Sequence, residues 1–137
     1  MAGEMRAFLG EIRGKKNATG ATIPKGYVVK LSAATDDLIL APAAIGDAHY
    51  GVTMQDILTG QWGDVQVTGI AVCIAGTGGV VRGDRLTHDS GGTYGRVFTA
   101  APGAGVNNAF VGVANRTAAA NAPVEVELAK PGSMLQG

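Results

Sequence analysis

Residues 60–89, GQWGDVQVTGIAVCIAGTGGVVRGDRLTHD, contain the turn around which the rest of the chain is organised. Val65 and Val67 alternate with polar residues, which is the pattern of a strand with one buried face. The pattern continues into the apolar run 70–75, which indicates burial on both faces of the same strand. A second strand pattern follows the glycine-rich segment. The stretch therefore predicts two strands joined by a tight turn.

The turn between these strands is rich in glycine. Glycine adopts positive φ without a steric penalty, and an aspartate carboxylate can accept backbone hydrogen bonds within a turn. We therefore assign a structural role to five residues of this segment: Gly76, Gly78, Gly79, Gly83 and Asp84.

Strand patterns occur in the same order on the two sides of the turn, which predicts an internal repeat. The interval between matching positions is nearly constant, from the pair Gly26 and Gly83 to the pair Gly51 and Gly112, so only small insertions separate the two halves. About eight short strands, with turns roughly every 8 to 12 residues, are typical of a small barrel or sandwich. We therefore predict an all-β fold, a small glycine-rich β-barrel or sandwich built from two similar four-strand halves.

This pattern divides the chain into three parts. A single β domain is expected over residues 21–130, with pseudo-repeats at about 21–76 and 79–130. A flexible N-terminal arm over residues 1–20 precedes it. A flexible tail over residues 131–137 follows the last strand.

The segment 1–20 differs in character from the rest of the chain. Its net charge is +2 and large apolar side chains are few, so no stable helix is expected. The segment is either a frayed terminus or an arm that orders on a partner surface, anchored by apolar and steered by basic side chains. The candidate contact residues are Arg6, Phe8, Ile12, Arg13, Lys15 and Lys16.

The composition narrows the classes of partner. Eleven acidic residues balance eleven basic ones, so no overall field draws the protein to nucleic acid or to an anionic membrane. Cys73 is the only cysteine, which excludes an intrachain disulfide. The apolar run around it is far shorter than a bilayer requires, and the N-terminus lacks a secretory pattern. We expect a protein partner and synthesis in a cytosol-like compartment.

Three short motifs are compatible with ligand binding, but each has a simpler explanation. Residues 78–84 lack the lysine and hydroxyl pair and the following helix of a phosphate-binding loop. Residues 82–84 spell the integrin-recognition tripeptide, but in the repeat they align with a turn. Asp84, His88 and Asp89 could approach a metal ion, but no second histidine lies at a ligand spacing. We predict no cofactor and no metal.

No set of residues forms a catalytic apparatus. Cys73 lies in an apolar run, which is typical of a small buried group with an unreactive thiol. The carboxylates at 36–37 belong to a turn, and those of Glu125 and Glu127 to the outer face of an alternating strand. Trp62 could pack over a barrel end or in a subunit interface, but packing in the core is the simpler expectation. We predict that the protein is not an enzyme.

One family has glycine and apolar residues in the same order and at similar intervals. The chain resembles the small capsid decoration, or cement, proteins of tailed bacteriophages over roughly residues 20 to 130. Position 73 departs from the pattern, because a cysteine stands where a β-branched residue is common. The matching run is Val67-x-Gly69-x-Ala71-x-Cys73-x-Ala75-Gly76-x-Gly78-Gly79-Val80-x-x-Gly83-Asp84-x-Leu86-Thr87, followed by Gly95-Arg96, Val111-Gly112-Val113-Ala114 and Val124-Glu125-Val126-Glu127-Leu128.

The resemblance implies a compact β-tulip-like fold and a homotrimer on the outer surface of a virion, made in the host cytoplasm. Such a protein bridges neighbouring subunits of the major capsid protein and stabilises the assembled shell. The arm over residues 1–20 is then expected to face the capsid, with the loops 43–48 and 101–109 as further contacts.

Two other classes of function remain open from the sequence. The first is a phage-surface module that binds a carbohydrate or a receptor. The second is a small hydrolase, which would lose activity when His88 is replaced by alanine.

Overall fold

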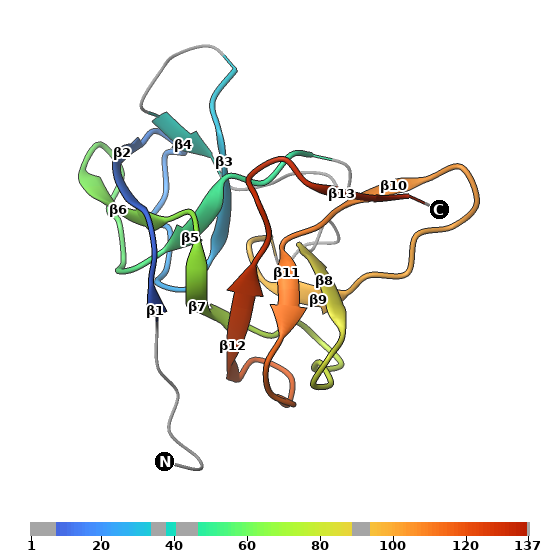
Figure 1. Cartoon of the computed structure of the whole chain (residues 1–137). Helices are drawn as coiled ribbons and strands as arrows, with labels where there is room; N and C mark the ends of the chain where they lie inside the picture. The colour runs from blue at the N-terminus through green and yellow to red at the C-terminus, as the bar shows by residue number, and fades with distance from the viewer. Residues whose placement is uncertain (1–7, 34–37, 41–46, 89–93, 137) are drawn as a thin grey trace.

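The computed structural model describes residues 8–33, 38–40, 47–88 and 94–136, and all regular elements in these ranges are β-strands (Figure 1). The predicted all-β, barrel-like fold is confirmed. The strands are β1 (Phe8–Leu9), β2 (Ile12–Asn17), β3 (Val28–Leu31), β4 (Leu38–Leu40), β5 (Gly51–Thr53), β6 (Trp62–Gln66), β7 (Gly69–Ile74), β8 (Arg85–His88), β9 (Val97–Thr99), β10 (Asn107–Ala109), β11 (Gly112–Ala114), β12 (Pro123–Leu128) and β13 (Met134–Gln136).

Two groups of five strands have the same order in space. The first is the closed barrel β2-β4-β3-β5-β6, and the second is the run β7-β12-β11-β8-β9 in a sheet to which β1 adds at the edge of β7. In the first group, β2 and β4 close the ring as a parallel pair that includes Asn17 and Ile39. In the second, a single parallel bridge joins Ala75 to Val97 at the equivalent position. We call residues 12–66 the first copy and residues 69–128 the second.

The pairing registers show how closely the copies correspond. Val28 pairs with Val52 in the first copy, and Arg85 pairs with Val113 at the matching positions of the second. The turn before the last strand of each copy also has a residue at positive φ, which is Gly60 at 78° in the first copy and Asn121 at 64° in the second. The repeat is therefore present in the structure, and each copy has five strands rather than the predicted four.

The additional strand corrects the prediction of an arm over residues 1–20. Residues 12–17 form β2, which pairs with β6 from Ile12 opposite Gln66 to Lys16 opposite Trp62. The boundary between the copies accordingly lies between β6 and β7, and not at the glycine-rich turn. Residues 1–7 lie outside the described residues.

The predicted flexible tail is corrected in the same way. Met134 to Gln136 form β13, which pairs antiparallel with β10 as a separate two-stranded sheet. The backbone of Phe110 extends this contact, because its N–H donates to the carbonyl of Ser133 at 2.8 Å.

Each copy has its own apolar core. Since successive side chains of a strand point to opposite faces, Val29 points into the first core while Val28 and Val52 belong to the core of the second copy. These two valines therefore join the copies into one unit. The first core consists of Ile23, Val29, Ile39, Ile57, Val65 and Val67, and the second copy contributes Ala71, Cys73, Ala75, Val80, Leu86, Val97, Val111, Ala114, Ala118, Val124 and Val126 to the other.

Candidate docking surfaces

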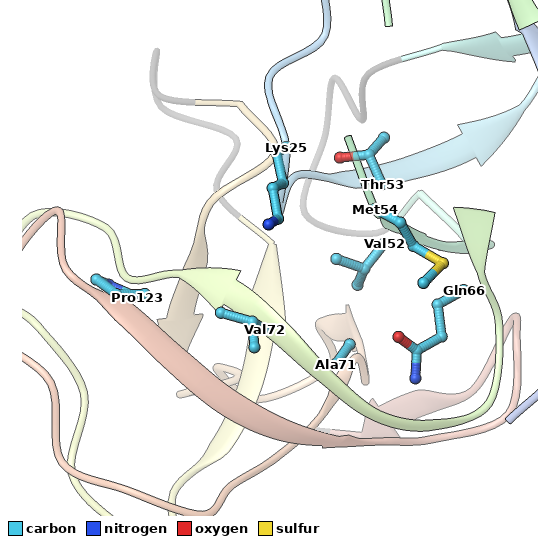
Figure 2. Close-up of a pocket in the computed structure, with 8 residues that line it drawn as sticks. All are labelled: Lys25, Val52, Thr53, Met54, Gln66, Ala71, Val72 and Pro123. Carbon is cyan, nitrogen blue, oxygen red and sulfur yellow. The ribbon is translucent and has the colours of Figure 1, made fainter. Parts of the chain in front are cut away.

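A cavity of about 410 Å³ lies at the junction between the two copies (Figure 2). Its walls are mostly apolar, and one charged residue, Lys25, belongs to its lining. The first copy contributes Lys25, Val52, Thr53, Met54 and Gln66, and the second contributes Ala71, Val72 and Pro123.

The two buried polar side chains of this lining are hydrogen-bonded within the chain, Thr53 inside the first copy and Gln66 across the connection from β6 to β7. Thr53 Oγ1 accepts a hydrogen bond from the Tyr27 N–H at 3.0 Å and donates one to the Pro24 carbonyl at 2.7 Å. Gln66 Nε2 donates to the carbonyls of Thr68 and Ile70, both at 3.0 Å, and so fixes the connection from β6 to β7. Both side chains are therefore hydrogen-bonded within the chain. We interpret the cavity as a gap left where the two copies pack together, rather than as a ligand site.

In the first copy, one face of the strand pair β2 and β6 is exposed. Residues directly opposite in an antiparallel pair project to the same face, so Lys16 lies beside Trp62 and Gly14 beside Asp64. Trp62 is 59% exposed, which shows that the expectation of core packing for this residue was wrong. Ile12, on the same side of β2, is 38% exposed. We call Ile12, Gly14, Lys16, Trp62 and Asp64 the β2–β6 outer face.

The predicted capsid-contact residues divide between the two faces of β2. Ile12 and Lys16 belong to the β2–β6 outer face. Arg13 forms an exposed ion pair with Glu11, which raises the pKa of the guanidinium, and such exposed pairs contribute little stability. Lys15 lies on the other side, with its Nζ 5.4 Å from the centre of the Tyr50 ring.

The two remaining residues of that prediction lie before β2. Phe8 belongs to β1, where its backbone pairs with Ile70 of β7. Arg6 lies outside the described residues. The structure thus brings four of the six residues onto one strand, although not onto one face.

The five turn residues lie within the second copy, between its first strand β7 and its second strand β8. Positive φ occurs at Gly78, Gly79 and Gly83, with values of 99°, 69° and 90°. The Gly79 N–H donates to the Gly76 carbonyl at 3.2 Å, which closes the first turn.

The carboxylate of Asp84 is held by one side-chain and one backbone hydrogen bond. Asp84 Oδ2 accepts hydrogen bonds from the Thr99 hydroxyl at 2.7 Å and from the Val81 N–H at 2.9 Å. Both bonds lower the pKa of the carboxyl. In the tripeptide at residues 82–84, this carboxylate oxygen is therefore already hydrogen-bonded within the chain.

The nucleophilic and metal-binding groups are buried or dispersed. Cys73 is fully buried, and burial raises the pKa of its thiol to about 12. His88 is also buried, with its Nε2 2.8 Å from the Asp47 carbonyl oxygen. Within the described residues, no group of three histidine, cysteine or acidic side chains could hold a metal ion. Asp89, the third residue of the set considered from the sequence, lies outside them.

His49 lies in the connection before β5 and lines a second cavity of about 290 Å³. Burial lowers its pKa to about 4, and the nearby His88 adds to that effect. The Ala129 backbone opposes the shift, but neither ring nitrogen reaches hydrogen-bonding geometry with a described residue, so burial prevails.

The part of the chain that the structure describes contains no helix with the length and apolar character needed to cross a bilayer.

No protein-family description matches the sequence, and no curated protein is similar to it at a significant level. Among solved structures, the chain is similar to the N base of the head fiber gp8.5 of bacteriophage phi29. The TM-score is 0.65, and the alignment covers 90% of this chain and 97% of that chain at 17% sequence identity. At this identity, the comparison establishes a common fold over nearly the whole of both chains.

Proposed function

We propose that this protein is a structural component of a phage virion, which binds the outer surface of the assembled capsid. One observation carries the proposal. The chain shares its fold, over almost its full length, with the base of a phage head fiber. The resemblance of its glycine and apolar pattern to capsid decoration proteins, which rests on sequence rather than on coordinates, favours the same location.

Binding stabilises the shell by mass action. A protein that binds only the assembled capsid lowers the free energy of that capsid by RT ln(1 + [L]/Kd) per site, where [L] is the concentration of the free protein. Contacts to two neighbouring subunits of the major capsid protein, repeated over the shell, resist their separation. The protein acts as a homotrimer, and it is made in the host cytoplasm before it joins the virion exterior.

The proposed role requires no catalysis. A hydrolase that used His88 would need that side chain to reach a substrate, whereas its exposed fraction is 0%. Cys73 has the same exposed fraction and a thiol that remains protonated at neutral pH. These two observations support a binding role over an enzymatic one.

We place the capsid contact at the start of β2, where the Arg13 side chain is exposed, and extend it to residues 1–7. Basic side chains favour an acidic capsid surface and accelerate the encounter with it. This contact is separate from the turn at residues 76–84, where the Asp84 carboxylate and several backbone groups are hydrogen-bonded within the chain.

Electron microscopy of undecorated capsids mixed with the purified protein tests the proposal. Added density is expected with the natural chain, and reduced occupancy is expected for Arg13→Glu and for a chain without residues 1–7. Lys130→Glu, which makes the same charge change at an exposed position after β12, is the matched control. The absence of binding by every chain would refute the capsid role, and glycan binding by the same protein would then favour a carbohydrate-binding module.

A further inference from the structure

Two buried histidines lie close to each other beside the cavity of about 290 Å³. His49 is 3% exposed and His88 is 0% exposed. Both ring nitrogens of His49, and Nδ1 of His88, are buried without a hydrogen-bond partner among the described residues. A buried polar atom that lacks a partner costs free energy. The closed form of this site therefore carries a cost that hydration of the rings would remove.

Residues 130–136, which we call the C-terminal segment, pack against His49. The Gly132 N–H donates to the His49 carbonyl at 3.0 Å. Pro131 and Gly132 line the cavity together with His49. The backbone of Ala129, directly before the segment, lies close enough to the His49 ring to influence its charge. Any path for water to this ring through the cavity is therefore bordered by the C-terminal segment.

Of the elements around His49, the C-terminal segment can move away at the lowest cost. His88 belongs to β8, which lies between β11 and β9 in the six-stranded sheet. The Tyr50 N–H donates to the Val29 carbonyl at 2.7 Å, which holds the connection before β5 on the barrel. By contrast, every residue of the C-terminal segment is exposed or half-buried, and β13 forms a two-stranded sheet with β10 (Figure 1). Such sheets are marginally stable alone, and segments with few buried contacts open first.

We infer that His49 is an acid-sensitive latch: its neutral ring allows the C-terminal segment to pack against the two copies, and its protonation in mild acid releases the segment while both copies stay folded. Release uncovers the edge of β10 that β13 occupies, together with the cavity beside Leu31 and Tyr50. The latch is a property of the free protein and requires no partner.

The charged groups on the elements that pack against His49 do not favour a second positive charge there. The titratable residues of these elements are Lys30 on β3, Asp47 and Tyr50 in the connection before β5, His88 on β8 and Lys130 in the C-terminal segment. The Asp47 carboxylate is already paired with the Lys30 ammonium at 2.9 Å. Burial, with a smaller contribution from His88, therefore keeps the pKa of His49 at about 4 while the segment is closed.

The opening equilibrium depends on pH with a definite sign. In the open form the solvated ring has the ordinary pKa of about 6.5, so the open form takes up a proton before the closed form does. The ratio of open to closed molecules is lowest above pH 6.5 and rises as the pH falls toward 4. With these two pKa values, the ratio increases about twentyfold between pH 7 and pH 5.

Amide hydrogen exchange of the full chain, measured by NMR and corrected for the intrinsic effect of pH on exchange, tests this inference without any capsid. The N–H groups of Gly132 and Phe110 report on the latch, because they donate to the carbonyls of His49 and Ser133. Their protection factors are expected to fall about twentyfold from pH 7 to pH 5 and to change little with low concentrations of urea. The Val80 N–H, bonded within the second copy, should be more strongly protected at both pH values and should lose protection as urea is added.

His49→Gln and His49→Leu, which both lack a titrating ring, should abolish the change at Gly132 between pH 7 and pH 5. Each variant is compared with itself at two pH values, so a general change of stability does not imitate this result. Equal protection of Gly132 at both pH values in the natural protein would overturn the inference, and so would a twentyfold change that persists in both variants. Equal urea dependence at Gly132 and Val80 would also overturn it, because the segment would then open only when the whole chain unfolds. None of these outcomes bears on capsid binding, so the two proposals can fail separately.

Discussion

At the scale of single residues, His49 links the fold to pH. Its pKa of about 4 lies below the value of about 6.5 expected for an unfolded histidine, because burial disfavours the charged ring. The unfolded chain therefore takes up the proton first. The stability that the neutral ring provides is complete above pH 6.5 and is lost as the pH falls toward 4.

We therefore expect the free energy of unfolding to decrease, by on the order of 2 to 3 kcal/mol in total, as the pH is lowered from 6.5 to 4. Urea denaturation at several pH values measures this change. Because carboxylates also titrate near pH 4, the comparison is made with His49→Gln, which should show a shallower decrease between pH 6.5 and 5. Equal slopes for the two proteins would contradict the assignment to His49.

At the scale of elements, close packing between strands depends on two equivalent glycines. A Cβ at Gly51 would lie 2.5 Å from the Gln66 carbonyl oxygen, and one at Gly112 would lie 2.1 Å from the Glu127 carbonyl oxygen. In both cases the obstacle is the backbone of the paired last strand of the copy, which cannot move away without breaking its ladder. The repeat thus preserves a close contact between strands as well as the order of strands.

Gly51→Ala and Gly112→Ala are accordingly each expected to destabilise the protein by about 1 to 3 kcal/mol, the usual cost of overpacking. Thermal unfolding of the two variants provides the measurement. Gly103→Ala is the control, since a Cβ there would meet nothing within 4 Å. A melting temperature for either variant equal to that of the control would show that the strands can separate without loss of stability.

Some strands can be predicted from the sequence pattern and others cannot. Residues 123–128 alternate between apolar and polar side chains, so the last strand of the second copy could be predicted. By contrast, β2 has the sequence IRGKKN, in which no such alternation occurs. It is a strand because β6 offers an edge to pair with, and this long-range pairing overrides local composition. Residues 134–136 pair with β10 for the same reason.

The candidate surfaces were predictable only in part. The basic residues of the N-terminal segment are visible in the sequence, but their division between two faces of β2 follows from a pairing register that composition does not contain. The exposure of Trp62 could not be predicted from its sequence context, because a tryptophan between two glycines is as compatible with a core as with a surface. Trp62 begins β6 as Pro123 begins β12, and both residues are exposed in the structure.

At the scale of the whole molecule, the two copies are expected to unfold together. Val28 and Val52 of the first copy are both buried in the core of the second, with exposed fractions of 0% and 1%. Loss of the first copy would expose the second core at these two positions, and loss of the second would leave both valines in water. Each copy therefore stabilises the other.

This coupling can be tested with two probes that the chain already contains. Trp62 fluorescence reports on the first copy, and the reaction of Cys73 with a thiol reagent reports on the second, because that thiol is fully buried until its copy opens. Under increasing urea the two signals should change with the same midpoint, as for a single cooperative transition. In Val52→Ala, which loses apolar contacts in the shared core, both midpoints should shift together to lower urea, by an amount equivalent to about 1 to 3 kcal/mol. Separate midpoints in the natural protein would show that the copies are independent units joined only by the chain between β6 and β7.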